Sequence, residues 1–242
     1  MTRSDDDAGG LRAHYNAMWE RAHGAIAAGD IDRDKRLLAG PDPRRGLTLI
    51  ARPAPALAAR FDGLLARLAE VEPGQYRQPP ADMHLTILSL FTVTEEPAAQ
   101  LARLDAYSAA VHAALDGVPA FGVEFKGITL SRGAVLACGY PHGAALETLR
   151  ERLRSELRSR SLDASLDGRY RLVTAHSTLL RFVSPLRDAA RFASLLEELR
   201  EEPLGSLWVD RLELVINDWY MDSGSIERLE LLRLPQAASL RS

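Results

Sequence analysis

The sequence predicts an α+β fold built mainly from antiparallel sheets. Strand-like and helix-like segments alternate irregularly along the 242 residues, as they do in this fold class. Two apolar segments face each other across Ser131-Arg132-Gly133, which predicts a hairpin. A strand, a helix and a second strand that opens with His-x-Thr occur in both halves of the chain. The length allows one large domain or two small lobes.

The N-terminal region divides into two parts. Residues 1–10 are acidic and end in glycines, so we expect no regular structure there. They also lack the basic-then-apolar order of a signal peptide. Residues 11–28 carry an apolar stripe at helical spacing, which predicts a helix docked on the core. The stripe consists of Leu11, Tyr15, Met18, Trp19, Ala22 and Ile26.

The next elements follow from composition and from turn residues. Residues 47–51 are short and apolar, which is typical of a strand, and prolines open an apolar helical stripe at 53–68. Further prolines bracket a short extended piece at 75–78. Residues 84–91 are rich in β-forming side chains and residues 97–115 in Ala and Leu, which predicts a strand and then a helix.

The second half begins with the predicted hairpin, formed by residues 121–130 and 134–140. Residues 144–159 are charged but place leucines on one helical stripe, so we expect an amphipathic helix. The same periodicities predict a strand at 174–183, a helix at 186–200 and a final pair of strands at 207–217 and 226–234.

Composition narrows the possible functions. A net charge of -3 and a pI of about 6.1 disfavour a surface that follows long nucleic acid, although a small anion or an RNA end is compatible with them. Cys138 is the only cysteine, which indicates a reducing compartment. No apolar run approaches the ~18 residues of a membrane span. We therefore expect a cytoplasmic monomer without a membrane partner.

Common phosphate, metal and cofactor signatures are missing from the sequence. It contains no GxxxxGK[ST], no GxGxxG on a strand, no HExxH and no cysteine cluster. His14 and His23 do not have the spacing of metal ligands, and Asp5-Asp6-Asp7 is typical of a solvated charge run. We expect neither a metal nor a cofactor.

Two short motifs are the main functional signal. His84-Leu85-Thr86-Ile87 and His176-Ser177-Thr178-Leu179 both read His-x-Thr-aliphatic, and both fall in strand-like segments. Given the abundance of His and Thr, two such tetrapeptides arise by accident with a chance of roughly one in a thousand. A single His-x-Thr on a strand is more often a structural pair, but two copies in matched contexts favour an active site.

Strand geometry explains the spacing within each motif. Side chains two residues apart share a face of a strand, so each motif presents one His and one Thr together. One imidazole can take a proton from an attacking oxygen while the other protonates the leaving oxygen of a phosphodiester. The hydroxyls can donate to the non-bridging oxygens. With ordinary pKa values of ~6.5, one neutral and one protonated imidazole can coexist at neutral pH. We expect the two imidazoles about 5–8 Å apart, on central strands of two lobes.

These motifs resemble those of the 2H phosphoesterase superfamily, which includes bacterial 2′-5′ RNA ligase-like proteins and cyclic phosphodiesterases. The likeness covers about residues 46–235 and includes the lead-in 79–83 and the form His-x-Thr-x-x-Arg, which ends at Arg181. It implies two pseudo-symmetric lobes of antiparallel sheet with outer helices and an active-site cleft between them. The chain then divides into an N-terminal extension, 1–45, and a bilobal domain, 46–242.

Other side chains are weaker candidates for substrate contact. Arg181 has an odd offset from His176, so a regular strand turns it away from the His/Thr face unless a bulge returns it. It is either a phosphate ligand or a salt-bridged structural arginine. Tyr76 and Tyr220 lie near predicted strand ends and either stack on a base or serve as ordinary rim or core aromatics.

The remaining unusual side chains are expected to be structural. Cys138 fits a small core residue in an apolar strand. His112 and His142 follow neither motif and are read as structural or solvated. Trp19 either packs against the core or lines a lid over the cleft.

The sequence thus predicts a metal-independent phosphodiesterase. The resemblance implies a nucleoside 2′,3′-cyclic phosphate, a cyclic phosphate on an RNA end, a 2′-5′ linkage or an ADP-ribose cyclic phosphate as substrate, and it allows RNA 2′-5′ ligase-like activity. The acidic pI favours small molecules over long RNA. The alternative is a non-catalytic nucleotide-binding module on the same fold. A carbohydrate-active or metal hydrolase would need paired carboxylates or ligand clusters, which the sequence lacks.

Overall fold

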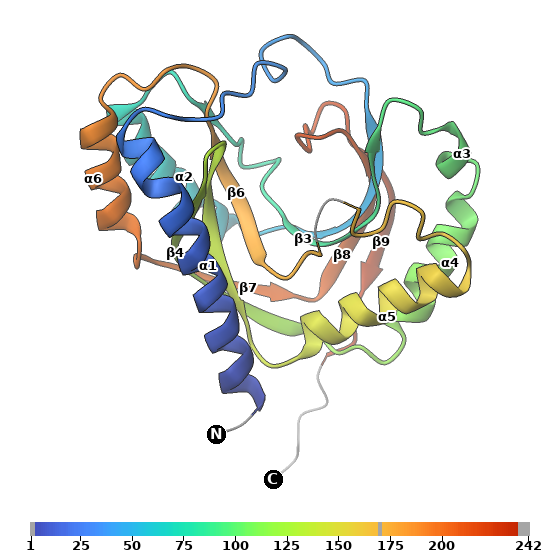
Figure 1. Cartoon of the computed structure of the whole chain (residues 1–242). Helices are drawn as coiled ribbons and strands as arrows, with labels where there is room; N and C mark the ends of the chain where they lie inside the picture. The colour runs from blue at the N-terminus through green and yellow to red at the C-terminus, as the bar shows by residue number, and fades with distance from the viewer. Residues whose placement is uncertain (1–2, 169–170, 237–242) are drawn as a thin grey trace.

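The computed structural model describes residues 3–168 and 171–236, and it contains two curled antiparallel sheets with helices outside them (Figure 1). The predicted α+β class is confirmed. The strands are β1 (Arg45–Ala51), β2 (Tyr76–Arg77), β3 (Leu85–Thr94), β4 (Phe121–Ser131), β5 (Ala134–Pro141), β6 (Ala175–Arg181), β7 (Pro203–Val209), β8 (Arg211–Asn217) and β9 (Glu227–Arg233). The helices are α1 (Arg3–Ala27), α2 (Pro55–Val71), α3 (Ala98–Leu101), α4 (Leu104–Leu115), α5 (Ala145–Ser159) and α6 (Ala189–Leu199).

The two sheets each receive one of the His-x-Thr motifs. One sheet has four strands in the order β3-β1-β8-β9, and the other has five in the order β2-β6-β5-β4-β7. The first motif lies at the start of β3 and the second on β6, so the motifs belong to different sheets. Residues of β3 and β6 contact each other, which brings the two motif strands together across the boundary between the sheets.

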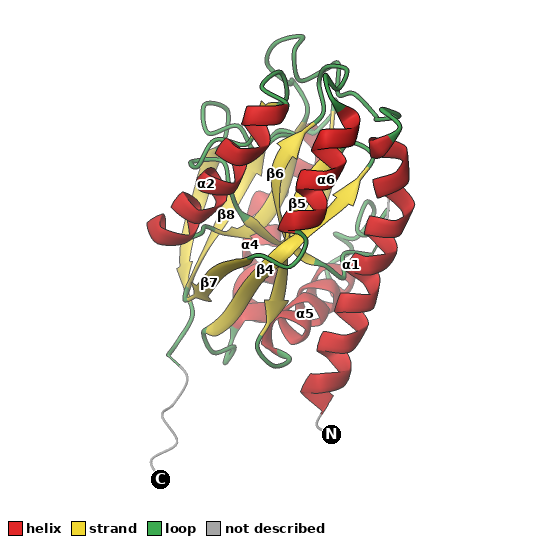
Figure 2. Ribbon diagram, turned by 90° about the vertical axis from the view of Figure 1, so that its left-hand side faces the viewer, coloured by secondary structure: helices red, strands yellow, loops and turns green. Residues whose placement is uncertain are grey.

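The connecting helices interlock the two halves. The helix α2, which follows β1 of the four-stranded sheet, packs on the five-stranded sheet beside α6 (Figure 2). There Phe61 of α2 meets Phe125 of β4 with ring centroids 5.3 Å apart. Conversely, α5 leaves β5 of the five-stranded sheet and packs against β3 of the other. One cluster of buried side chains therefore spans both halves.

The N-terminal helix is docked by the apolar stripe that the sequence shows. Tyr15, Trp19 and Ile26 are all buried. The Tyr15 hydroxyl donates to the carbonyl of Gly139 over 3.1 Å and accepts from the amide of Ala175 over 2.9 Å, so α1 is tied to β5 and β6. Trp19 packs in the core, and it is not among the described residues that line the cleft between the sheets.

Three expectations about the elements are wrong. The helix expected at 97–115 is two helices, α3 and α4, with a turn at 102–103 between them. Residues 3–10 are helical, because α1 begins at Arg3. Acidic residue types near a helix N-terminus complement the helix dipole, so the early charge run is compatible with a helix. The segment 207–217 is two strands in different sheets rather than one. Buried residues in this segment fall at odd positions up to Val209 and resume at an even position, Leu212, and this shift by one residue marks the passage to the other sheet.

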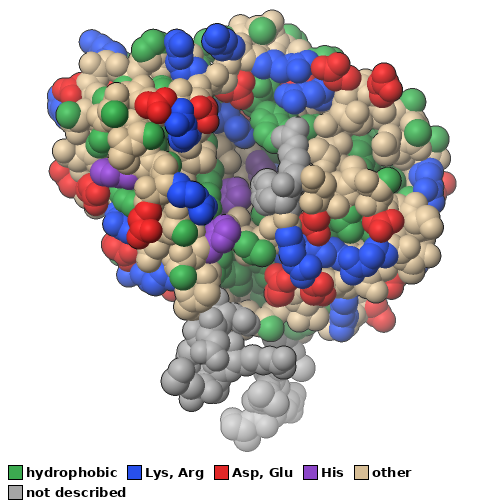
Figure 3. Space-filling view, viewed as in Figure 1, with side chains coloured by type: hydrophobic (Ala, Val, Ile, Leu, Met, Phe, Trp, Pro, Cys, Tyr) green, Lys and Arg blue, Asp and Glu red, His purple; other side chains and the backbone are tan. Residues whose placement is uncertain are grey.

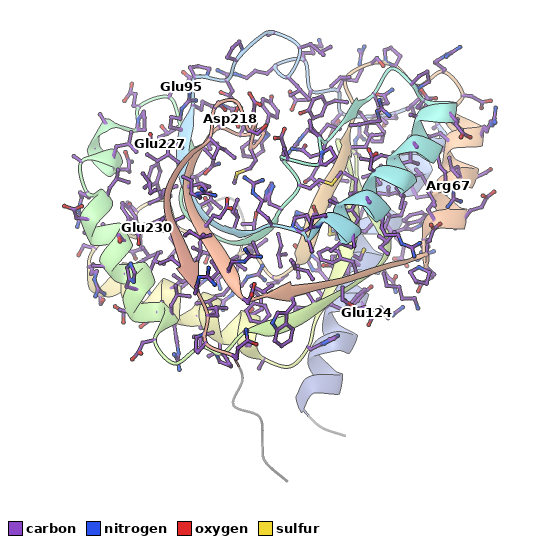
Figure 4. The ribbon with its side chains drawn as sticks, turned by 180° about the vertical axis from the view of Figure 1, so that it is seen from behind. Arg67, Glu95, Glu124, Asp218, Glu227 and Glu230 are labelled. Atoms are coloured by element: carbon purple, nitrogen blue, oxygen red, sulfur yellow. The ribbon has the colours of Figure 1, made fainter. Side chains whose placement is uncertain are left out.

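The helix α4 is held on the four-stranded sheet by a carboxylate on β9. Figure 4 shows Glu230 on β9, where it accepts hydrogen bonds from the Ser108 hydroxyl and from Nε2 of His112, the latter at 2.7 Å. His112 is thus hydrogen-bonded to a carboxylate at the surface, and Cys138 is buried on β5. Within the described part of the chain, no helix has the length and apolar character needed to span a membrane.

Candidate active site

A cavity of about 230 Å³ opens where the two sheets meet, and both motifs line it. Figure 3 shows histidine side chains gathered in the central hollow of this face. The lining residues that the argument below uses are His84, Thr86, Ser89, His176, Thr178 and Arg181. The His and Thr side chains of both motifs therefore face the same cavity.

The two motif strands hold different positions in their sheets. His84 directly precedes β3, which is the edge strand of its sheet, whereas His176 lies within β6, which pairs with β5 at His176 and with β2 at Leu180 and Arg181. The expectation of two central strands is therefore wrong for His84. An edge strand has one side free of a sheet neighbour, and this is the side on which β3 can approach β6.

A β-bulge lies at the last residue of each motif and changes which later side chain faces the cavity. Ile87 is the extra residue of β3 opposite β1, and Leu179 is the extra residue of β6 opposite β5. An extra residue resets the alternation of the strand. As a result Ser89 and Arg181, each five residues after its histidine, return to the cavity wall. Ser89 escaped the sequence reasoning, but aligning the two motifs pairs it with Arg181.

Arg181 contributes a cation without an ion-pair partner among the described residues. Its Nε is buried and donates to no described residue, and its guanidinium lies 5.6 Å from the centre of the Tyr220 ring. Burial lowers the pKa of Arg181, while the carboxylates of Asp34 and Asp218 oppose that shift from a distance. A buried donor costs free energy when it stays unpaired. The geometry therefore suits an anion in the cavity better than it suits a structural salt bridge.

The two candidate tyrosines have different positions. Tyr220 lines the cavity but is buried, and its hydroxyl donates to Oδ1 of Asp34 over 2.9 Å. Its amide donates to Oδ1 of Asp218, which Figure 4 shows in the loop after β8. Tyr76 is half-buried opposite Arg181 in the β2–β6 pair, and it is not among the described lining residues. The structure thus brings Tyr220, and not Tyr76, to the cavity.

Both catalytic candidates use Nδ1 for a protein contact. Nδ1 of His84 lies 2.7 Å from the carbonyl oxygen of Asp82. A carbonyl only accepts, so Nδ1 of His84 carries the proton. Nδ1 of His176 lies 2.7 Å from Oγ1 of Thr174, a hydroxyl that can donate or accept. In each ring Nε2 is the nitrogen left for a substrate.

The surrounding protein keeps both imidazoles neutral. Desolvation lowers the pKa of each to about 4. The carbonyl of Asp82 favours the protonated form of His84, while Arg52 and Arg181 oppose it. Protonation of His176 is opposed by four neighbours, which are His84, Arg150, Arg181 and His14. The expectation of one protonated imidazole at neutral pH therefore does not hold without a ligand. A bound phosphate would add negative charge between the rings and raise these pKa values.

Arg150 of α5 forms hydrogen bonds with the backbone of both motif-bearing segments. It is buried, and its Nε donates to the carbonyl of Ile87 over 2.8 Å. Its Nη2 donates to the carbonyls of Thr86 and Thr174, at 3.0 and 2.8 Å. One guanidinium thus holds the backbone of both motif segments. The sequence reasoning missed it, although Arg150 lies on the same stripe of α5 as the buried leucines.

Comparison with known proteins identifies the family. The family described as the 2′-5′ RNA ligase superfamily matches residues 53–219. The chain belongs to this superfamily, and the resemblance seen in the motifs is confirmed. The superfamily contains enzymes of phosphoesterase and RNA-ligase type. No curated protein matches the sequence.

Solved structures show the same fold. TT0787 of Thermus thermophilus is 20% identical, with a TM-score of 0.57 over 79% of this chain and 98% of that one. Escherichia coli LigT in apo form is 16% identical, with a TM-score of 0.53 over 81% of this chain and 100% of that one. LigT complexed with 3′-AMP is 16% identical, with a TM-score of 0.51 over 80% of this chain and 99% of that one. At these identities the likeness concerns the fold.

Proposed function

We propose that the protein is a metal-independent phosphodiesterase that acts on a cyclic or 2′-5′ phosphodiester of a nucleotide or an RNA end. The observation that carries the proposal is the convergence of two His/Thr pairs and Arg181 on one cavity. Membership of the superfamily supports it. The LigT structures with phosphate, ATP and 3′-AMP support a phosphate-bearing nucleotide as ligand.

The side chains divide the work around one phosphate. The phosphate lies between the two Nε2 atoms, so that an attacking and a leaving oxygen each meet one imidazole. The hydroxyls of Thr86 and Thr178 donate to the non-bridging oxygens, where charge grows in the transition state. Arg181 pairs with the same oxygens and thereby satisfies its buried Nε.

The Nδ1 partners assign the acid and the base. His84 is the acid, because its hydrogen bond to a carbonyl stabilises the imidazolium form. His176 is the base, because its Nδ1 partner is a hydroxyl and not a carbonyl, and because Arg150 opposes its protonation in addition to Arg181, which acts on both rings. Its Nδ1–H donates to Thr174, and its Nε2 lone pair then faces the attacking oxygen. With a 2′,3′-cyclic phosphate, water loses a proton to His176, its oxygen bonds to phosphorus, and the ester oxygen that leaves takes a proton from His84.

A substrate panel tests the proposal. Purified protein is assayed with EDTA present on 2′,3′-cyclic nucleotides and on 2′-5′ linked dinucleotides. We expect turnover of at least one of them, and loss of that turnover in His84→Ala and His176→Ala. Binding of a nucleotide monophosphate without any turnover would support the non-catalytic binding module instead. Activity that needs added Mg²⁺ or Mn²⁺ would contradict metal independence.

A further inference from the structure

A second cavity, of about 380 Å³, lies beside the catalytic one. This volume is within the ~300–1,000 Å³ range of small-molecule sites. Its walls are the N-terminal half of α1, the turn after β5, the start of α5 and the segment before β6. The lining residues on which the argument rests are Leu11, His14, Tyr140, Pro141, Glu147 and Val173. Because α1 precedes residue 53, part of this wall lies outside the region that matches the superfamily.

The second cavity adjoins the catalytic cavity on the side of His176. Leu172 lines the catalytic cavity, and the next residue, Val173, lines the second one. The helix α1 is fixed there, since the Tyr15 hydroxyl accepts from the amide of Ala175. His14 of α1 is near enough to affect the charge state of His176. Figure 3 shows a hollow on this face with several histidines along it.

The walls combine apolar and polar surfaces in a way that suits a flat heterocycle. Val173 is 42% exposed, which is unusual for a large apolar side chain in the described part of this chain. The ring of Tyr140 is half-buried, with the Arg12 guanidinium 5.3 Å from its centre. His14 and Glu147 are exposed and supply a hydrogen-bond donor and an acceptor. Stacking on an aromatic ring with polar contacts at the edge is how proteins hold unpaired bases.

We propose that the second cavity is a subsite for a second nucleoside of the substrate. The inference rests on the proposed function. With the phosphate between His84 and His176, a nucleoside on the His176 side reaches the Tyr140 wall of the second cavity. A cyclic mononucleotide has only one nucleoside and leaves one of the two sites empty. The preferred substrate class is then a phosphodiester that joins two nucleosides.

Two exposed positions test the subsite without touching the catalytic cavity. Glu147→Ala and Val173→Asn are compared with the wild type on a 2′-5′ linked dinucleotide and on a 2′,3′-cyclic mononucleotide, at one pH that is the same for every protein and both substrates. Each variant removes one contact to the second base, so each should lose about 10-fold in kcat/KM on the dinucleotide, which corresponds to ~1.4 kcal/mol. Activity on the cyclic mononucleotide should stay within about twofold. Leu231→Asn, on the exposed face of β9, is the matched control and should change neither activity.

The outcomes separate this inference from the proposed function. Equal losses on both substrates, or no loss on the dinucleotide, would overturn the subsite. A wild type that turns over the cyclic mononucleotide but no dinucleotide would also overturn it, while the phosphodiesterase proposal stands. A wild type that turns over neither substrate, nor any other member of the panel, would remove the proposed function and the subsite with it.

Discussion

The two His-x-Thr motifs are copies in sequence but not in environment. The first begins just before an edge strand, and the second lies on β6, which has β5 as a neighbour on one side and the short β2 at its far end on the other. A bulge lies at the last residue of each, so the fifth residue after the histidine faces the cavity in both copies. That residue is Ser89 in the first copy and Arg181 in the second. The repeat therefore supplies two imidazoles and two hydroxyls, whereas the guanidinium in the cavity wall, that of Arg181, comes from the second copy.

The two imidazoles also differ in the hydrogen-bond partner of Nδ1. His84 donates from Nδ1 to the carbonyl of Asp82, whereas His176 meets the hydroxyl of Thr174. A carbonyl permits one tautomer of the neutral ring, and a hydroxyl permits both. A pseudo-symmetric fold can thus give two identical side chains different roles through one neighbouring atom each. The predictions below test this asymmetry, starting with the largest expected effect.

Replacing either histidine should have the largest effect. His84→Ala and His176→Ala each remove a proton-transfer step, so we expect losses of ~10²–10⁴-fold in kcat. The double variant should be little slower than the slower single variant, because groups that act as one unit are not additive. His112→Ala, at a surface hydrogen bond outside the cavity, is the control. Losses that multiply in the double variant would show that the two rings act independently.

The residues that follow the two bulges should differ in effect. Arg181→Met removes a charged donor to the phosphate, worth ~1.5–3 kcal/mol, so kcat/KM should fall about 10–100-fold. Ser89→Ala, at the matching position of the other copy, should cost no more than a few-fold. Steady-state kinetics on a substrate that the wild type turns over measure both changes. Equal losses would contradict the claim that the charge of Arg181 contributes more to catalysis than the hydroxyl of Ser89.

Arg150 should affect one histidine and not the other. Its charge is among those that lower the pKa of His176, whereas the charges that lower the pKa of His84 are those of Arg52 and Arg181. Arg150→Met should therefore raise the pKa of His176 alone, as measured by an NMR titration of the imidazole protons. Arg150→Lys keeps the charge but cannot hold both segments, so it should lower activity while the pKa of His176 stays low. Leu157→Ala loosens α5 without touching either motif and should leave both pKa values unchanged.

The sequence showed much of the fold because periodicity reports local contacts. The strand and helix patterns gave the α+β class, and the hairpin turn gave the β4–β5 pair. The passage between sheets near Asp210 was missed, because a change of sheet depends on distant partners. Only the change of phase in the buried alternation marked it. The helical start of α1 was missed because a run of aspartates was read as a solvated tail.

The site was predictable where it depended on spacing within one strand. His84, Thr86, His176 and Thr178 follow from the period of two, and the structure brings them to one cavity. Arg181 needed a bulge, which is visible only in the pairing of β6 with β5. The pKa values of the imidazoles depend on desolvation and on neighbours from other elements, so no local pattern could give them.

The lowered pKa values predict how stability depends on pH. Each imidazole has a pKa of about 4 in the folded chain, against an ordinary value of ~6.5. Between these values the unfolded chain binds a proton that the folded chain does not. The free energy of unfolding should therefore fall as the pH drops from ~6.5 towards 4, and should not change on their account above ~6.5. His176→Asn removes one of the two groups, so its urea midpoints should fall less steeply over this range. Midpoints that run parallel to those of the wild type would contradict the pKa shift.

The unequal roles of the two histidines can be tested most directly by changing the leaving group. The measurement compares His84→Ala and His176→Ala on a nucleoside phosphodiester whose leaving group is a ribose oxygen and on the analogue with p-nitrophenolate, a much weaker base that departs without a proton. If His84 is the acid, the His84→Ala variant should recover most of its lost activity on the p-nitrophenyl ester, and the His176→Ala variant should not. Equal recovery in both variants, or recovery only in His176→Ala, would contradict the assignment.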